Sequence, residues 1–220
     1  MKITIIYDNE TSRSDLVPDW GFACLVEAHG ITILFDTGAK GNILLRNMEK
    51  LNIDPKSIEI IVISHGHWDH TGGLEDFLEK NRNIKLYIPS FYGIPSCAVD
   101  EAIEVKGPMQ ICEGVFSTGE LQGETEDGIE TEQSLVVHND KGPVVIVGCS
   151  HPGVREILES ASTHGKVHAL IGGLHGFSEF DILKEIDIVC ATHCTQYIAA
   201  IKSMYPDKYT EGGAGRIIEL

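Results

Sequence analysis

The stretch Ser64-His65-Gly66-His67-Trp68-Asp69-His70 decides the fold, and it directly follows the apolar, β-branched run Ile58–Ile63. It places three histidines and one aspartate within six positions. In extended backbone, residues i and i+2 point the same way, so His65 and His67 are expected to bind one metal ion. Asp69 and His70 come after the chain turns and are expected to reach a second ion. Imidazole and carboxylate together suit zinc, with manganese or iron as alternatives.

Three later segments each place a histidine just past the carboxyl end of an apolar run. They are Gly148-Cys149-Ser150-His151, Gly172-Gly173-Leu174-His175 and Thr192-His193-Cys194-Thr195. In layered α/β structures such strand ends converge on ligands, so these segments are expected to complete a two-metal site. Their cysteines have two interpretations, as zinc ligands or as small buried apolar residues.

These residues resemble the metallo-β-lactamase superfamily. The resemblance is carried by His65-x-His67-x-Asp69-His70, the upstream Leu34-Phe35-Asp36-Thr37-Gly38 and the continuation Thr71-Gly72-Gly73-Leu74. It implies an αββα sandwich: two mixed β-sheets with helices on the outer faces and a metal site along one sheet edge. Asp36 has two interpretations, as a carboxylate that orients a ligand histidine or as the cap of its own turn.

The later histidine segments narrow the resemblance. They are similar to the subgroup of 7,8-dihydropterin-6-methyl-4-(ribofuranosyl)aminobenzene 5′-phosphate synthases and uncharacterised metal-dependent hydrolases. By that resemblance, His65, His67 and His151 hold the first metal, and Asp69, His70 and His193 hold the second. The resemblance also makes His175 an additional ligand or a group that faces the substrate. In the chemistry expected of a two-zinc site, Asp69 would also orient the attacking water.

The sequence departs from the superfamily pattern in three places. It has no Pro-Gly-His motif, and Cys149-Ser150-His151 follows the run Val144–Val147 where Gly-Asp-Thr is expected. A histidine cannot bridge two metals as a carboxylate does, so the sequence predicts a weaker second metal or a bridge made by water alone. Gln196 stands where the subgroup has glycine, which concerns the substrate pocket more than the metals.

The composition disfavours proteins that bind nucleic acids or anionic membranes. The chain has 220 residues and a formal net charge of −16, which weighs against nucleic-acid and anionic-membrane binding. Residues 107–140 contain eight acids and no Lys or Arg, which favours a solvated loop with strand edges, or a loop that repels polyanions. No secretory signal or membrane span is visible, so a cytoplasmic protein with reduced thiols is expected.

Hydrophobic patterning predicts one α/β domain over residues 1–220. Helices are expected at 40–51, 72–80, 153–163, 178–185 and 195–204. Strands are expected at 2–7, 22–28, 31–35, 58–63, 84–88, 103–105, 115–118, 134–138, 144–147, 167–171 and 186–191, with a hairpin turn at His29-Gly30.

The function predicted from these features is metal-dependent hydrolysis of a small ester, phosphoester or lactone. The resemblance leaves open the synthase reaction, a condensation with loss of pyrophosphate, for which Arg13, Arg46 and Arg155 are the candidate cationic contacts. It also leaves open a single-iron sulfur dioxygenase. A di-iron flavoprotein is disfavoured, because such relatives carry glutamate at the position of His67. The natural substrate and the oligomeric state do not follow from the sequence.

Overall fold

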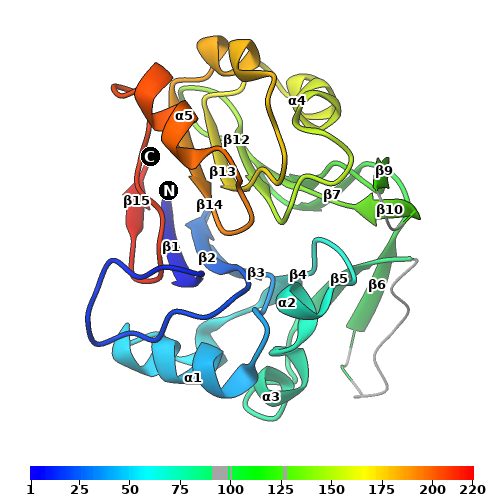
Figure 1. Cartoon of the computed structure of the whole chain (residues 1–220). Helices are drawn as coiled ribbons and strands as arrows, with labels where there is room; N and C mark the ends of the chain where they lie inside the picture. The colour runs from blue at the N-terminus through cyan, green and yellow to red at the C-terminus, as the bar shows by residue number, and fades with distance from the viewer. Residues whose placement is uncertain (91–98, 100, 126–127) are drawn as a thin grey trace. The chain divides into compact units, whose positions relative to one another are not determined.

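The computed structural model describes residues 1–90, 99, 101–125 and 128–220. The chain divides into two compact units, each built on its own β-sheet (Figure 1). The first unit comprises Met1–Lys106 and Gly212–Leu220, and the second comprises Gly107–Glu211. The expectation of one domain over 1–220 stays a prediction.

The first unit contains a seven-stranded mixed sheet in the order β15-β1-β2-β3-β4-β5-β6. Strands β1, β2, β3 and β15 pair antiparallel, and β3 to β6 pair parallel. The strands are β1 (Lys2–Tyr7), β2 (Ala23–Ala28), β3 (Ile31–Phe35), β4 (Ile60–Val62), β5 (Lys85–Pro89), β6 (Glu101–Val105) and β15 (Ile217–Glu219). The helices are α1 (Gly41–Lys50), α2 (Trp68–Thr71) and α3 (Leu74–Leu78), with a 3-10 turn at Pro55–Ser57.

The helices α1 and α3 cover one face of this sheet (Figure 1). Leu44 and Met48 of α1 and Phe77 of α3 are fully buried with alternate residues of the strands. The spacing of these apolar residues is that of one helix face, which is why residues 40–51 were expected to form a helix. Packing of this face against the sheet holds the loops at the strand ends in place.

The second unit contains a six-stranded mixed sheet in the order β14-β13-β12-β11-β8-β7 and a separate hairpin of β9 and β10. Strands β12, β13 and β14 are parallel, and the others pair antiparallel. The strands are β7 (Met109–Cys112), β8 (Val115–Ser117), β9 (Leu121–Thr125), β10 (Gly128–Glu132), β11 (Leu135–Val137), β12 (Val144–Val147), β13 (Ala169–Gly173) and β14 (Ile188–Thr192). The helices are α4 (Val154–Ser162) and α5 (Ile198–Met204), with a 3-10 helix at Phe180–Glu185.

A second apolar core packs on the parallel part of this sheet. Val154, Ile157 and Ala161 of α4 and Ile201 of α5 are buried in one cluster with residues of β12 to β14. Because all three parallel strands run the same way, their carboxyl ends lie at one edge of the sheet. The loops that carry His151, Leu174–His175 and His193 begin at that edge.

The expected α/β class with two mixed sheets is confirmed. The hairpin turn at His29-Gly30 is also confirmed, since both residues have positive φ (51° and 76°) as a type I′ turn requires. The helix expected at 178–185 is wrong in type, because Phe180–Glu185 is a 3-10 helix. The strands β7, β9, β10 and β15 were not expected, since they lack a strong apolar pattern.

The expected solvated character of residues 107–140 is wrong for Glu132, which is 1% exposed at the end of β10. Glu126 and Asp127 of this segment lie outside the described residues, as does Cys97. No disulfide joins the five cysteines in the described part of the chain. Among the described residues, no helix is long and apolar enough to cross a membrane.

Candidate metal-binding site

The predicted ligands of the first unit lie on the loop and short helix that follow β4. The loop after β3 holds this segment in place. The backbone N–H and the hydroxyl of Thr37 both donate hydrogen bonds to the carbonyl of His70, at 2.8 and 2.9 Å. Gly72 permits this close approach, since a Cβ there would lie 2.1 Å from the carbonyl oxygen of Ala39. A Cβ at Gly73 would likewise lie 2.2 Å from the carbonyl oxygen of Thr37, so packing requires both glycines of the motif Thr71-Gly72-Gly73.

Asp36 is fully buried and orients two of the predicted ligand histidines. Its Oδ2 lies 2.7 Å from Nδ1 of His70 and accepts a hydrogen bond of 2.7 Å from the hydroxyl of Ser64. Its Oδ1 accepts a hydrogen bond of 2.7 Å from the backbone N–H of Ser64. Of the two interpretations drawn from the sequence, these contacts agree with the one in which Asp36 is a carboxylate that orients a predicted ligand histidine.

This network determines which nitrogen of each ring can bind a metal. A carboxylate only accepts, so Nδ1 of His70 carries the proton and Nε2 presents a lone pair. The hydroxyl of Ser64 donates its one hydrogen bond to Asp36. The Ser64 oxygen therefore accepts a hydrogen bond from Nδ1 of His65, which lies 2.8 Å away. Nε2 of His65 therefore also presents a lone pair.

His65 and His67 converge on one point, as the i, i+2 spacing predicted. Nε2 of His65 and Nδ1 of His67 are 3.1 Å apart. A zinc ion bound to both, with bonds of about 2.05 Å at the tetrahedral angle, would hold these nitrogens about 3.3 Å apart. The pair needs little movement to accept such an ion.

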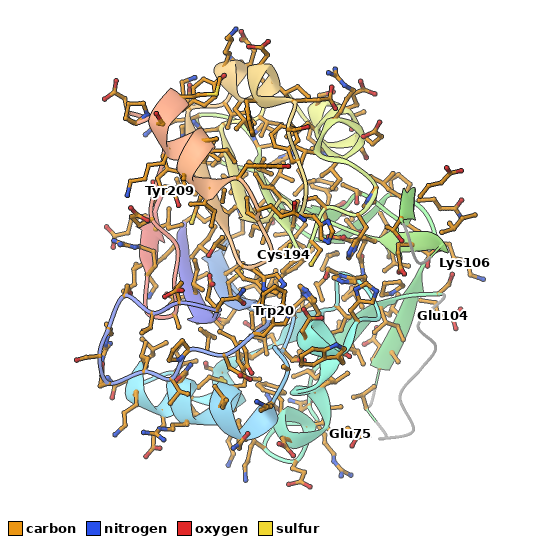
Figure 2. All side chains as sticks on the ribbon, viewed as in Figure 1. Trp20, Glu75, Glu104, Lys106, Cys194 and Tyr209 are labelled. Atoms are coloured by element: carbon orange, nitrogen blue, oxygen red, sulfur yellow. The ribbon has the colours of Figure 1, made fainter. Side chains whose placement is uncertain are left out.

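Asp69 and His70 form a second pair of donors. Oδ2 of Asp69 lies 3.8 Å from Nε2 of His70, the nitrogen that Asp36 leaves available. Oδ2 also accepts a hydrogen bond of 2.8 Å from Nε1 of Trp20, which lies on the segment between β1 and β2 and is labelled in Figure 2. The indole holds the carboxylate in one orientation, although it is 49 residues away in the sequence.

In the second unit, Glu132 organises the loop that carries His151. Its carboxylate accepts hydrogen bonds of 2.9–3.1 Å from four successive backbone N–H groups, those of residues 148–151. The positive φ of Ser150 (63°) lets these N–H groups converge on one anion. These four hydrogen bonds fix the backbone of the loop against the carboxylate of Glu132.

The same carboxylate orients the His151 ring, since Oε2 of Glu132 lies 3.1 Å from Nδ1 of His151. The histidine therefore donates from Nδ1 and presents the lone pair of Nε2, as His65 and His70 do. Burial lowers the pKa of His151, but the hydrogen bond to Glu132 and its charge outweigh burial and raise the pKa above its ordinary value. Glu132 thus strengthens the ring as a base.

His193 and Cys149 accompany His151 in the second unit. His193 is 7% exposed and Cys149 is 3% exposed. The sulfur of Cys149 lies within 4.8 Å of a ring nitrogen of His151 and within 4.8 Å of a ring nitrogen of His193. Cys149 thus lies near one potential ligand nitrogen of each histidine, at the carboxyl ends of β12 and β14.

His175 lies beside this group and is exposed. Its ring centroid is 5.4 Å from that of His151, and its carbonyl accepts a hydrogen bond of 2.9 Å from the N–H of Gln196. Its φ is positive (43°), as is that of His193 (53°). Such backbone strain in non-glycine residues is concentrated at functional sites.

Two residues with evident roles were not found by sequence reasoning. Glu132 and Trp20 contact predicted ligands, but they lie far from them in the sequence and in no motif. The one available signal for Glu132 was its position at the end of an alternating run, just before the apolar Leu135–Val137. Trp20 offered no signal.

Comparison with known proteins gives a consistent result. Residues 21–173 match the family described as the metallo-beta-lactamase superfamily. The chain is 30% identical to the 7,8-dihydropterin-6-methyl-4-(beta-D-ribofuranosyl)-aminobenzene-5'-phosphate synthase of Methanocaldococcus jannaschii, with 90% of this chain and 88% of that protein covered. It is 27% identical to an uncharacterized protein of the same organism, with 99% and 100% covered.

Solved structures share the fold. A metal-dependent hydrolase of the beta-lactamase superfamily aligns with a TM-score of 0.77 and 24% identity, covering 100% of this chain and 99% of the other. Zinc-bound PqqB from Methylobacterium extorquens aligns with a TM-score of 0.66 and 13% identity over the full length of both chains.

Proposed function

Since the chain belongs to the metallo-β-lactamase superfamily, we propose that it is a metal-dependent hydrolase of a small ester, phosphoester or lactone. We assign two divalent metal ions to it, zinc in preference to manganese or iron. His65, His67 and His151 would hold the first ion, and Asp69, His70 and His193 the second.

One observation carries this proposal, namely that buried carboxylates dictate the ring nitrogens of three assigned ligands. Asp36 acts on His70 directly and on His65 through Ser64, and Glu132 acts on His151. Ligand histidines in metalloproteins commonly donate their second N–H to such a partner. A histidine that merely fills a polar loop has no need of a buried carboxylate aimed at its Nδ1.

When bound, the two ions would supply a water molecule of lowered pKa and would polarise the substrate oxygen. The chain's own groups would then orient the reactants. The carboxylate of Asp69, held by the indole of Trp20, would accept a hydrogen bond from the attacking water. The exposed ring of His175, beside His151, would contact the substrate.

A second candidate is the reaction of the Methanocaldococcus jannaschii synthase, supported by 30% identity over 90% of this chain. A condensation that releases pyrophosphate calls for cationic contacts. Arg13 is paired with Asp15 and Arg155 with Glu179, all on exposed side chains. These pairings disfavour two of the three arginines as phosphate contacts, so hydrolysis is our leading proposal.

The small-molecule substrate and the cytoplasmic location are further parts of the proposal. The net charge of −16 disfavours a polyanionic substrate such as RNA. An anionic small molecule remains compatible, because its charge would be met by metal ions rather than by lysine and arginine.

The test combines elemental analysis with an activity panel on one preparation. Metal-stripped protein is reconstituted with zinc, manganese or iron and assayed on esters, phosphodiesters, lactones and the synthase substrates. We expect about two ions per chain and hydrolysis that depends on them. His138→Ala is the matched control, because His138 contacts His164 at 3.3 Å and is not an assigned ligand.

Other outcomes would overturn the proposal. Metal content near zero after reconstitution would remove the assigned centre. Oxygen consumption by a form with a single iron would favour the dioxygenase instead. Product formation from the synthase substrates, without hydrolysis of any panel compound, would favour the second candidate.

A further inference from the structure

Two histidines of the second unit form a pair at the edge of its sheet opposite the candidate metal-binding site. His138 follows β11, and Val137 at the end of β11 pairs with Val144, the first residue of β12. The loop that carries His151 instead follows the last residue of β12. Nε2 of His138 and Nδ1 of His164 are 3.3 Å apart. We propose that this histidine pair binds one divalent transition-metal ion, independently of the function proposed above.

The separation of the two facing nitrogens suits such an ion. Two nitrogens bound to zinc at about 2.05 Å and at the tetrahedral angle lie about 3.3 Å apart. Nε2 of His138 and Nδ1 of His164 already have this separation. In the metal-free protein, one of the two rings donates its N–H to the other, because two facing lone pairs would repel. When each ring carries its proton on its other nitrogen, both facing nitrogens offer a lone pair to the ion.

Phe116 of β8 packs against both imidazole rings. The centroid of its ring lies 4.8 Å from that of His138 and 4.4 Å from that of His164, with an interplanar angle of 39° in each case. Phe116 also packs against the core of the second unit. Both imidazoles thus lie against an aromatic ring that the core holds in place. This contact limits their rotation and reduces the entropy that is lost when an ion orders them.

The backbone segments that carry the two histidines are fixed as well. The N–H of His138 donates to the carbonyl of Gly114 at 2.8 Å, and the N–H of His164 donates to a carbonyl in the last turn of α4 at 3.0 Å. The turn after His138 packs on the segment after His164, because a Cβ at Gly142 would lie 2.3 Å from the carbonyl oxygen of Lys166. A bound ion would therefore cross-link two segments that already contact each other.

The ligands determine the class of ion and its strength of binding. Imidazole suits copper, nickel and zinc, whereas magnesium and calcium require oxygen ligands. The pair supplies two of the four ligands that zinc takes, so water completes the coordination. Such an ion is bound more weakly than one with three or more protein ligands, and gel filtration should remove it. His138→Ala therefore remains a valid control for hydrolysis by the centre proposed above.

Equilibrium dialysis of the whole chain against nickel, with magnesium in excess, tests the proposal. Wild type should bind one nickel ion more than His138→Gln or His164→Gln. The double variant should lose no more than either single variant, because one ion needs both rings. Asp140→Asn is the matched control, since Asp140 is an exposed carboxylate in the adjacent turn, and it should bind as much nickel as wild type. These differences do not depend on how many ions the candidate metal-binding site holds.

Two further measurements keep the test independent of how the variants fold. At a nickel concentration of about 100 times the Kd of the pair, the ratio of folded to unfolded wild type should rise about 100-fold, with a smaller rise in the double variant. Nickel should also protect His138 and His164 of wild type from diethyl pyrocarbonate, as read by peptide mass spectrometry. This second measurement requires no substitution.

Several results would overturn the proposal. Equal nickel binding by wild type and both single variants would show that the pair holds no ion. Loss of the extra ion in excess magnesium, or an equal loss in Asp140→Asn, would assign the nickel to the acidic surface and not to imidazole. Unchanged modification of both histidines in saturating nickel would exclude them as ligands even if a variant fails to fold.

Discussion

Replacing Glu132 by alanine should destabilise the second unit severely, because it removes the acceptor of four backbone N–H groups at once. A buried donor left without a partner costs about 1–3 kcal/mol, so four give about 4–12 kcal/mol. The carboxylate's own desolvation cost is recovered, and water can enter the space that is left. We therefore expect a loss near the lower limit, about 4 kcal/mol in the free energy of unfolding.

The assay is urea unfolding of the metal-free protein, followed by both circular dichroism and tryptophan fluorescence. A loss of about 4 kcal/mol corresponds to a fall in Tm of about 8–16 °C for a chain of this size. Glu132→Gln should lie between alanine and wild type, because one amide oxygen still accepts while the amide NH2 faces two donors of His151. Zinc affinity of Glu132→Gln should fall about 10–100-fold, since His151 loses its orienting carboxylate.

The matched control is Glu124→Gln, in the same acidic segment but exposed on β9. A surface change of this kind should stay within about 0.5 kcal/mol of wild type. If the free energy of unfolding of Glu132→Ala lies within about 1 kcal/mol of the wild-type value, the four N–H groups do not depend on this carboxylate and the reasoning is refuted. An unchanged zinc affinity in a folded Glu132→Gln would refute the orienting role separately.

Four further substitutions follow from the site geometry. Asp69→Asn keeps the size of the side chain but removes its charge, so kcat on the panel substrate should fall by about 10²-fold or more, with metal content measured in parallel. His65→Ala and His193→Ala should each lower metal content without unfolding the chain, which elemental analysis and circular dichroism together would check. Asp36→Asn should weaken metal binding about 10–100-fold in a chelator competition, because the two rings it orients lose their fixed protonation.

Each of these changes has an outcome that would count against it. An Asp69→Asn enzyme with both metals and near-normal kcat would leave Asp69 as a loop-shaping residue. Cooperative unfolding of either histidine variant at room temperature would make that residue structural. An Asp36→Asn protein with wild-type affinity would return Asp36 to its alternative role as a turn cap.

The sequence determined the α/β class, most of the central strands and the segment that supplies the first four predicted ligands. These depend on local patterns: β-branched runs that form buried strands, and i, i+2 spacing that directs His65 and His67 to the same side. The distance of 3.1 Å between their facing nitrogens agrees with that spacing. The helix over 40–51 followed from apolar periodicity in the same way.

Only the tertiary structure identified Glu132 and Trp20 as partners of the predicted ligands, and only it decided between the two interpretations of Asp36. Glu132 looked like one more solvated acid, yet it is buried and binds a loop 16–19 residues further along. Trp20 and Asp36 act on residues 49 and 34 positions away. The physical reason is that the role of a carboxylate or an indole depends on the donors and acceptors that folding places beside it. Sequence patterns report a residue's own backbone and not these distant partners.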